Sequence, residues 1–355
     1  MFKDVLDNIR KQTSEESTAQ LWERDYRFAG AVNKAMGRLQ GHEKIRIQPG
    51  DWFRTSSLYF FTTCPRQVIF TKESGEFMYG DMDERGMWAV AVGRAYHSIF
   101  QNEVLSRFDY RDVVVLGAVE DDKVVESFED LVIYNRLRDG KEIEEYREFR
   151  FEDSQWRVTG HCDGILVWRR DEDEEAWMKA VMERDVKWLV EHGDMEVLEL
   201  KTIGDTALVS NGPKEDHVLQ VSSYMLLIER MFKRLGGNVN IEGARVVYIG
   251  KSIKDWREFV EWKVGWNEDR RKDIEAVLTE IRWLIDEATL EDIDKYDVLP
   301  ICKRKGWRYY KCPFAKVCLA YDKGEISLDV LRQLKDNTGD ANQRTSAGGK
   351  EGNDD

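Results

Sequence analysis

Apolar residues along the chain recur either at the spacing of a helix or in the short runs of a strand. Helical spacing marks four long stretches, at 87–108, 172–192, 216–235 and 267–288. Strand-like runs lie at 112–119, 146–151, 156–168, 196–202, 244–250 and 257–264. Because the two kinds alternate without a strict order, the pattern predicts an α/β protein with a mixed central sheet flanked by helices.

The two ends of the chain differ from its middle. Residues 1–50 contain helical stretches at 2–11 and 18–40, which we interpret as an N-terminal helical extension. Residues 51–325 carry the strands and form the predicted main domain. Residues 336–355 contain no large apolar residue, so we expect a disordered tail there.

A helical insertion interrupts the main domain at about residues 170–193. Trp177 and Trp188 lie at roughly helical spacing within it. We interpret the insertion as surface decoration, or else as a lid or a docking surface for a protein partner.

The strand EVLELKT at 196–202 carries two charges where a core strand is normally apolar. Alternate residues of a strand point to the same face, so Glu199 and Lys201 share one face and Leu198 and Leu200 the other. Burying a charged pair costs free energy unless the charges are partnered or used in chemistry. Glu199 and Lys201 therefore form either a buried ion pair or part of a functional site.

A second strand has the same peculiarity. In GHCDGIL, Asp163 stands in an otherwise apolar run beside Gly160 and Gly164. Two carboxylates at one end of a sheet form a hard, oxygen-rich site suited to Mg²⁺ or Mn²⁺. A lysine such as Lys201 can help to deprotonate water there or stabilise charge on a phosphoryl oxygen. The alternative is a Glu199–Lys201 bridge with an unrelated aspartate.

Polar residues on two predicted helices add to this set. His97 follows Gly93 in GRAYH, although a lone helical histidine is more often structural. Gln220 and Tyr224 are four residues apart and so share one face of a helix that is otherwise apolar. Tyrosine tips at the edge of a core are common, so each motif alone is weak.

In chain order these residues form a pattern that resembles the PD-(D/E)XK nuclease superfamily, in its RecB-like branch: His97, Asp163, Glu199, Lys201, Gln220 and Tyr224. The resemblance spans about residues 56–320 and implies a restriction-endonuclease-like core. It implies that His97, Asp163 and Glu199 ligate the metal ion and that Lys201 is the catalytic lysine. It further implies that Gln220 and Tyr224 lie beside the scissile phosphate and the strand being cut.

Three neighbours of this set have weaker claims to a role. Cys162 is adjacent to Asp163 and faces the other way, so we expect a buried core thiol. His161 shares the face of Asp163 and is either polar packing or a support for the metal ligands. Glu148 adds a possible acidic contact near the metal.

Cysteines form the second candidate site. Cys302, Cys312 and Cys318 lie close together in the sequence, and Cys64 lies far from them. Four thiolates can complete an iron–sulfur cluster or a zinc site, which would join the two ends of the main domain. Packing of free thiols without a metal is the alternative.

The segment SLYFFTTCPR with the terminal C-x5-C resembles the iron–sulfur exonucleases of the CRISPR-associated Cas-four type. This resemblance implies a 4Fe–4S cluster on Cys64, Cys302, Cys312 and Cys318. The family usually has C-x2-C before the x5 spacing, whereas nine residues separate Cys302 from Cys312 here.

The loop between these cysteines alternates cations with aromatic rings, a composition that suits single-stranded nucleic acid. Its predicted DNA contacts are Lys303, Arg304, Lys305, Trp307, Arg308 and Tyr309. A solvated charged loop is the alternative. The net charge of −14 argues against a protein whose whole surface attracts nucleic acid, but not against a local basic groove.

These observations together predict a Mg²⁺- or Mn²⁺-dependent DNA exonuclease that hydrolyses phosphodiester bonds from single-stranded ends. The alternatives are a structure-selective endonuclease with the same site and a non-catalytic subunit that binds DNA ends. The sequence has no P-loop and no apolar run long enough to span a membrane. Its start lacks the apolar core of a secretory signal, so we expect a cytoplasmic protein without a membrane partner.

Overall fold

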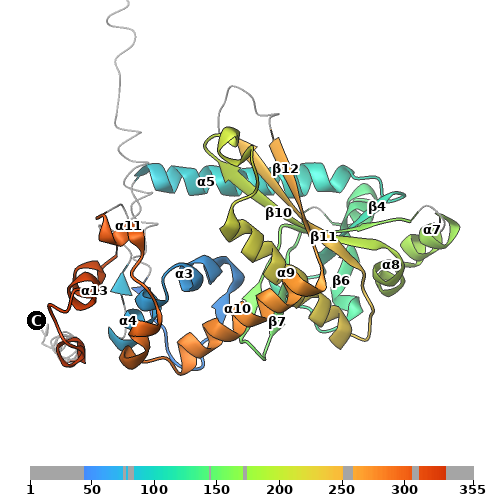
Figure 1. Ribbon diagram of the computed structural model, residues 1–355. Helices are drawn as coiled ribbons and strands as arrows, with labels where there is room; N and C mark the ends of the chain where they lie inside the picture. Colours follow the sequence, from blue (N-terminus) through green and yellow to red (C-terminus); the bar gives the residue numbers. More distant parts are fainter. Residues whose placement is uncertain are drawn as a thin grey trace, which may run out of the picture. The chain divides into compact units, whose positions relative to one another are not determined.

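The computed structural model describes residues 44–74, 77–78, 84–143, 145–170, 174–250, 259–305 and 312–332 (Figure 1). The chain divides into two compact units, Met1–His42 with Gly80–Ala89, and Glu43–Tyr79 with Val90–Asp355. Of the first unit, only residues 84–89 are described. The predicted helices at 2–11 and 18–40 and the predicted tail at 336–355 lie outside the described residues.

A six-stranded sheet in the second unit has the strand order β12–β11–β10–β9–β4–β6. Its strands are β4 (Val113–Ala118), β6 (Leu131–Ile133), β9 (Gly164–Trp168), β10 (Asp194–Ile203), β11 (Ile241–Gly250) and β12 (Phe259–Gly265). β10 and β11 are parallel, and the other neighbours in this sheet are antiparallel. The predicted α/β class with a mixed sheet flanked by helices is confirmed.

A smaller sheet has the order β2–β8–β7–β5. Its strands are β2 (Phe53–Arg54), β5 (Lys123–Val124), β7 (Phe149–Asp153) and β8 (Val158–Gly160), and β1 (Lys44–Ile45) pairs separately with β3 (Phe77–Met78). The single strand predicted at 156–168 is therefore wrong. The chain leaves β8 at Gly160 and enters β9 at Gly164, so that Asp163 lies in the connection between the two sheets.

The remaining described elements are α-helices and helical turns. The α-helices are α3 (Leu58–Thr63), α4 (Pro65–Ser74), α5 (Glu84–Ile99), α6 (Tyr134–Asp139), α7 (Glu174–Glu183), α8 (Val186–His192), α9 (Glu215–Arg234), α10 (Glu268–Asp286), α11 (Pro300–Lys303) and α13 (Ala315–Asp322). The 3₁₀ turns are η2 (Thr55–Ser57), η4 (Leu105–Arg107), η5 (Phe128–Asp130), η6 (Thr206–Val209) and η7 (Leu290–Lys295), and η3 (Phe100–Val104) is a π-helical turn. Within the described ranges, no helix is long and apolar enough to cross a membrane.

The two faces of β10 pack against different cores. Val197 belongs to the large core, which contains the apolar side of α9 and the helix α10 that packs on α9. Leu198 and Leu200 belong to a smaller core on the opposite face, which Leu105 and Tyr134 complete. The alternation along β10 thus places Glu199 and Lys201 on the face toward α9.

The helical insertion is part of the large core. Trp177 of α7 is 1% exposed, and Val181 and Leu189 are fully buried beside it. The Trp177 indole donates a hydrogen bond to the carbonyl of Tyr110. The insertion therefore packs one side of α7 against the large core, and its interpretation as decoration, lid or docking surface stays a prediction.

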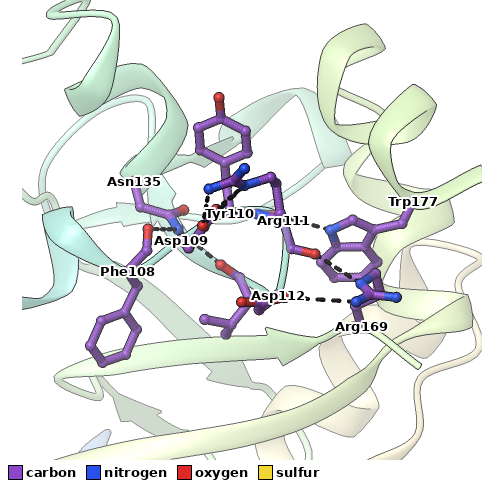
Figure 2. Close-up of polar contacts among 9 residues, drawn as sticks. Phe108, Asp109, Tyr110, Arg111, Asp112, Asn135, Arg169 and Trp177 are labelled. Carbon is purple, nitrogen blue, oxygen red and sulfur yellow. Dashed lines mark hydrogen bonds and ion pairs between the residues drawn. The ribbon is translucent and has the colours of Figure 1, made fainter. Parts of the chain in front are cut away.

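Three side chains fix the segment that leads into β4 (Figure 2). The Asn135 amide of α6 donates to the carbonyl of Phe108, Trp177 to that of Tyr110, and Arg169 to that of Arg111. Asn135 also donates to the carbonyl of Val113 and accepts the N–H of Val115. Since Asn135 is 1% exposed, it satisfies backbone groups that water cannot reach.

We expect Asn135→Ala to lower the free energy of unfolding by about 3 kcal/mol, because buried donors and acceptors lose their partner. Urea unfolding measures the change. Asp139→Ala, an exposed change in the same helix, is the control and should cost less than about 0.5 kcal/mol. Equal stability of the two variants would contradict the role given to Asn135.

Candidate active site

Asp163 is held between a helix and a strand. Its Oδ1 lies 2.8 Å from Nδ1 of His97 in α5, and its Oδ2 accepts the backbone N–H of Leu200 in β10 at 2.6 Å. The side chain is buried, as the Asp163 exposure of 7% shows. Two of the predicted metal ligands, His97 and Asp163, are therefore in direct contact, although 66 residues separate them in sequence.

Glu199 and Lys201 form an ion pair on the neighbouring part of β10. Glu199 is 4% exposed, whereas the Lys201 side chain is 23% exposed and reaches the edge of the site. The predicted Glu199–Lys201 bridge is thus present. Asp163 belongs to the same group of charges, because it contributes to the raised pKa of Glu199.

Burial and the neighbouring carboxyl groups make a negative charge on Glu199 costly. Burial raises the pKa of Glu199 well above its ordinary value, and the charge of Asp163 raises it further, while Lys201 acts in the opposite direction. Glu148 lies close enough to contribute in the same sense as Asp163. A site of this kind favours a cation.

His97 is oriented by the contact with Asp163. Burial lowers the pKa of His97, but the hydrogen bond and the charge of Asp163 outweigh burial, so the net pKa shift is upward. Because a carboxylate can only accept, Nδ1 donates its proton to Asp163. Nε2 is then the nitrogen with which His97 can bind a metal ion.

Gln220 and Tyr224 of α9 lie behind Glu199. The Gln220 amide contacts the Tyr224 hydroxyl at 2.5 Å, and the Tyr224 ring packs edge-on against Phe151. Burial raises the pKa of Tyr224 well above its ordinary value, and the charge of Glu199 raises it further, so the hydroxyl stays neutral. At 9% and 2% exposure, Gln220 and Tyr224 form the inner wall of the site.

Gln101 is a site residue that the sequence pattern did not reveal. It lies in the π-helical turn η3, four residues after His97, and its amide donates to Glu148 Oε1 at 2.6 Å and to the Asp163 carbonyl at 3.1 Å. The spacing of four from His97 was the available signal. Through Gln101, Glu148 is tied to the loop that carries Asp163.

The neighbours of Asp163 point elsewhere. Cys162 is 4% exposed and belongs to the large core, as predicted. The His161 imidazole lies 2.6 Å from Asp122 on the outer side of the loop. His161 is therefore not part of the His97–Asp163 contact.

The donor types at this site suit Mg²⁺ or Mn²⁺, since they are an imidazole nitrogen and buried carboxylate oxygens. In the described part of the chain, no three or more His, Cys, Asp or Glu side chains are arranged to hold a metal ion. The reason at this site is that His97 and Asp163 turn toward each other and Glu199 turns toward Lys201. The residues fit the ion by chemistry, and binding would require these side chains to reorient.

The four predicted cluster cysteines line one cavity of about 20 Å³. Cys64 ends α3, and Cys302 lies in α11, while Cys312 and Cys318 lie before and within α13. Burial raises the pKa of Cys312 to about 11, and the other three thiols add to the shift. The four thiols share this cavity, but they are not arranged around a metal ion in the part of the chain that the structure describes.

Of the predicted DNA-contact loop, the structure describes Lys303, Arg304 and Lys305, which are exposed. Lys303 pairs with Asp322 at 3.2 Å. Trp307, Arg308 and Tyr309 lie outside the described residues, so the predicted interleaving of cations and rings stays a prediction.

No model of a protein family matches the chain, and no curated protein matches it.

Proposed function

We propose that the chain is a metal-dependent DNA exonuclease with a restriction-endonuclease-like core of the PD-(D/E)XK type. The observation that carries this proposal is the gathering of His97, Asp163, Glu199 and Lys201 at the point where β9 stops pairing with β10. These residues come from α5, from the β8–β9 connection and from β10.

His97 Nε2, Asp163 and Glu199 would hold a Mg²⁺ or Mn²⁺ ion, which when bound supplies positive charge that polarises a phosphodiester oxygen. Lys201 would donate hydrogen bonds from Nζ to the attacking water or to a phosphoryl oxygen. In the reaction, the water oxygen bonds to phosphorus, one phosphorus–oxygen bond breaks, and the leaving oxygen takes up a proton. The resemblance implies that Gln220 and Tyr224 lie beside the scissile phosphate; because both are buried, we propose instead that they support Glu199 from behind.

A 4Fe–4S cluster on Cys64, Cys302, Cys312 and Cys318 completes the proposal, with zinc as the alternative. Support comes from the shared cavity, which four of the five cysteines line. The cluster would hold the N-terminal and C-terminal parts of the main domain together, and its binding free energy would add to that of folding.

Lys201→Ala should reduce the rate of DNA degradation at least about 100-fold, because it removes a donor to the reacting groups. Degradation of end-labelled single-stranded DNA with Mg²⁺ or Mn²⁺ measures the rate. Lys233→Ala, an exposed change on α9, is the matched control and should leave the rate unchanged. A wild-type rate in Lys201→Ala would remove this residue from the mechanism.

An exonuclease needs an end, so linear single strands should be degraded while closed circular single strands of the same sequence survive. Gel analysis of both substrates in one reaction makes the comparison. Cleavage of the circle would favour the structure-selective endonuclease. Binding of ends without degradation of either substrate in Mn²⁺ would favour the non-catalytic subunit.

Anaerobically purified protein should be brown, and Cys312→Ala should abolish its visible absorbance. Cys162→Ala, which changes the fifth cysteine in the large core, should keep the colour. Iron and sulfide analysis quantifies the cluster in each protein. A colourless wild type that contains stoichiometric zinc would show that the cluster assignment is wrong.

A further inference from the structure

Tyr248 of β11 lies directly opposite Lys201 in the parallel pair of β10 and β11. Opposite residues of neighbouring strands project to the same face, so the Tyr248 side chain stands on the Glu199–Lys201 face of the sheet. Tyr248 is fully buried and belongs to the large core. Its ring therefore borders the candidate active site from the side of β11.

The Tyr248 hydroxyl joins two groups at the start of α9. It accepts the backbone N–H of Lys214 at 3.0 Å and lies 2.7 Å from Nδ1 of His217. The hydroxyl has one proton, and the Lys214 N–H occupies one of its acceptor positions. Donating that proton to Nδ1 satisfies the buried hydroxyl, and it places the imidazole proton of His217 on Nε2.

His217 is uncharged near neutral pH. Burial lowers the pKa of His217 to about 4, with Lys201 and Lys214 acting in the same direction and Asp216 against them. The Asp216 carboxylate lies 3.8 Å from Nε2, beyond hydrogen-bond range. Among the described residues, Nε2–H thus has no hydrogen-bond acceptor.

His217 lies on the same side of α9 as two residues of the candidate active site. His217 precedes Gln220 by three residues and Tyr224 by seven, so all three share the helix face that borders Glu199. Tyr248 lies opposite Lys201 in the strand pairing and 2.7 Å from His217, which places His217 on the Lys201 side of the sheet. The His217 side chain is 17% exposed, whereas Gln220 and Tyr224 are buried.

We propose that His217 donates its Nε2–H to a phosphodiester oxygen of the DNA strand next to Lys201, and that Tyr248 fixes the tautomer that makes this possible. The inference rests on the proposed nuclease function. A neutral donor suits this place, because a second cation beside Lys201 would compete for the carboxylates that hold the metal ion. Tyr248 acts through His217 and is a positioning residue.

The tautomer is measured directly by ¹⁵N NMR of histidine-labelled protein, since the chain has only five histidines. The spectrum of His217 should show a bare Nδ1 and a protonated Nε2. Tyr248→Phe should mix the tautomers, because the hydroxyl proton is lost. A protonated Nδ1 in the wild type would overturn the inference.

Kinetics separate a substrate contact from a structural role. His217→Ala should raise the KM for single-stranded DNA about tenfold with little change in kcat, the effect expected for one lost hydrogen bond to a charged oxygen. His217→Gln should restore most of the affinity because its amide nitrogen lies near the place of Nε2, whereas His217→Asn should not. His192→Gln, on the exposed histidine of α8, is the control and should change nothing.

A single methylphosphonate in the DNA identifies the contacted phosphate. At one position in the DNA, the methylphosphonate should raise the KM of the wild type but leave the KM of His217→Ala unchanged. Tyr248→Phe should weaken binding in the wild type and change nothing in the His217→Ala background. An unchanged KM in His217→Ala, or equal methylphosphonate penalties in both proteins, would overturn the inference.

A different result would show that the nuclease proposal itself fails. If the wild type cuts no DNA with Mg²⁺ or Mn²⁺, the nuclease proposal fails. Fluorescence anisotropy of labelled single-stranded DNA then tests His217 alone, with binding about tenfold weaker in His217→Ala as the expected result. Equal binding of the two proteins would overturn the role of His217 as well.

Discussion

The hydrogen bond from the Leu200 N–H to the Asp163 carboxylate organises the candidate site. β9 pairs with β10 only as far as Gly164 opposite Leu198, so the ladder between these strands stops two residues before Leu200. Asp163, the residue just before β9, accepts the Leu200 N–H that would pair with β9 if this strand continued. The same bond holds a carboxylate beside Glu199 in spite of their repulsion, and His97 contacts its other oxygen. The end of a strand pair thus creates the charge concentration on which the proposed chemistry depends.

Much of this arrangement follows from local sequence patterns. The fold class, the strands around Glu199 and the polar face of α9 were predicted because alternation and helical spacing are local properties. The break at His161–Asp163 was not, because an apolar run does not reveal that its two halves join different sheets. His217 and Tyr248 were also missed. Their contact depends on how α9 packs on β11, which no short segment encodes.

The cysteine cavity also depends on contacts that the sequence pattern does not reveal. Spacing near the C-terminus identified three thiols, and Cys64 was a candidate fourth ligand far from them in the sequence, supported by the resemblance. In the structure, Arg66, two residues after that cysteine, donates to Cys318 and to the carbonyl of Tyr296. Arg66 is 5% exposed and so ties α4 to the C-terminal segment through a buried cation. This contact brings the thiols together by packing that does not itself require a metal.

The parallel pairing of β10 and β11 also determines the order in which the protein can be assembled. All of α9 must be made between these strands, and β11 must be in place before Tyr248 can meet His217. Folding during synthesis generally starts from the N-terminal side. The sheet through β12 can therefore close while Cys302, Cys312 and Cys318 are still being added. The thiol cavity can then form last, after the sheet is complete.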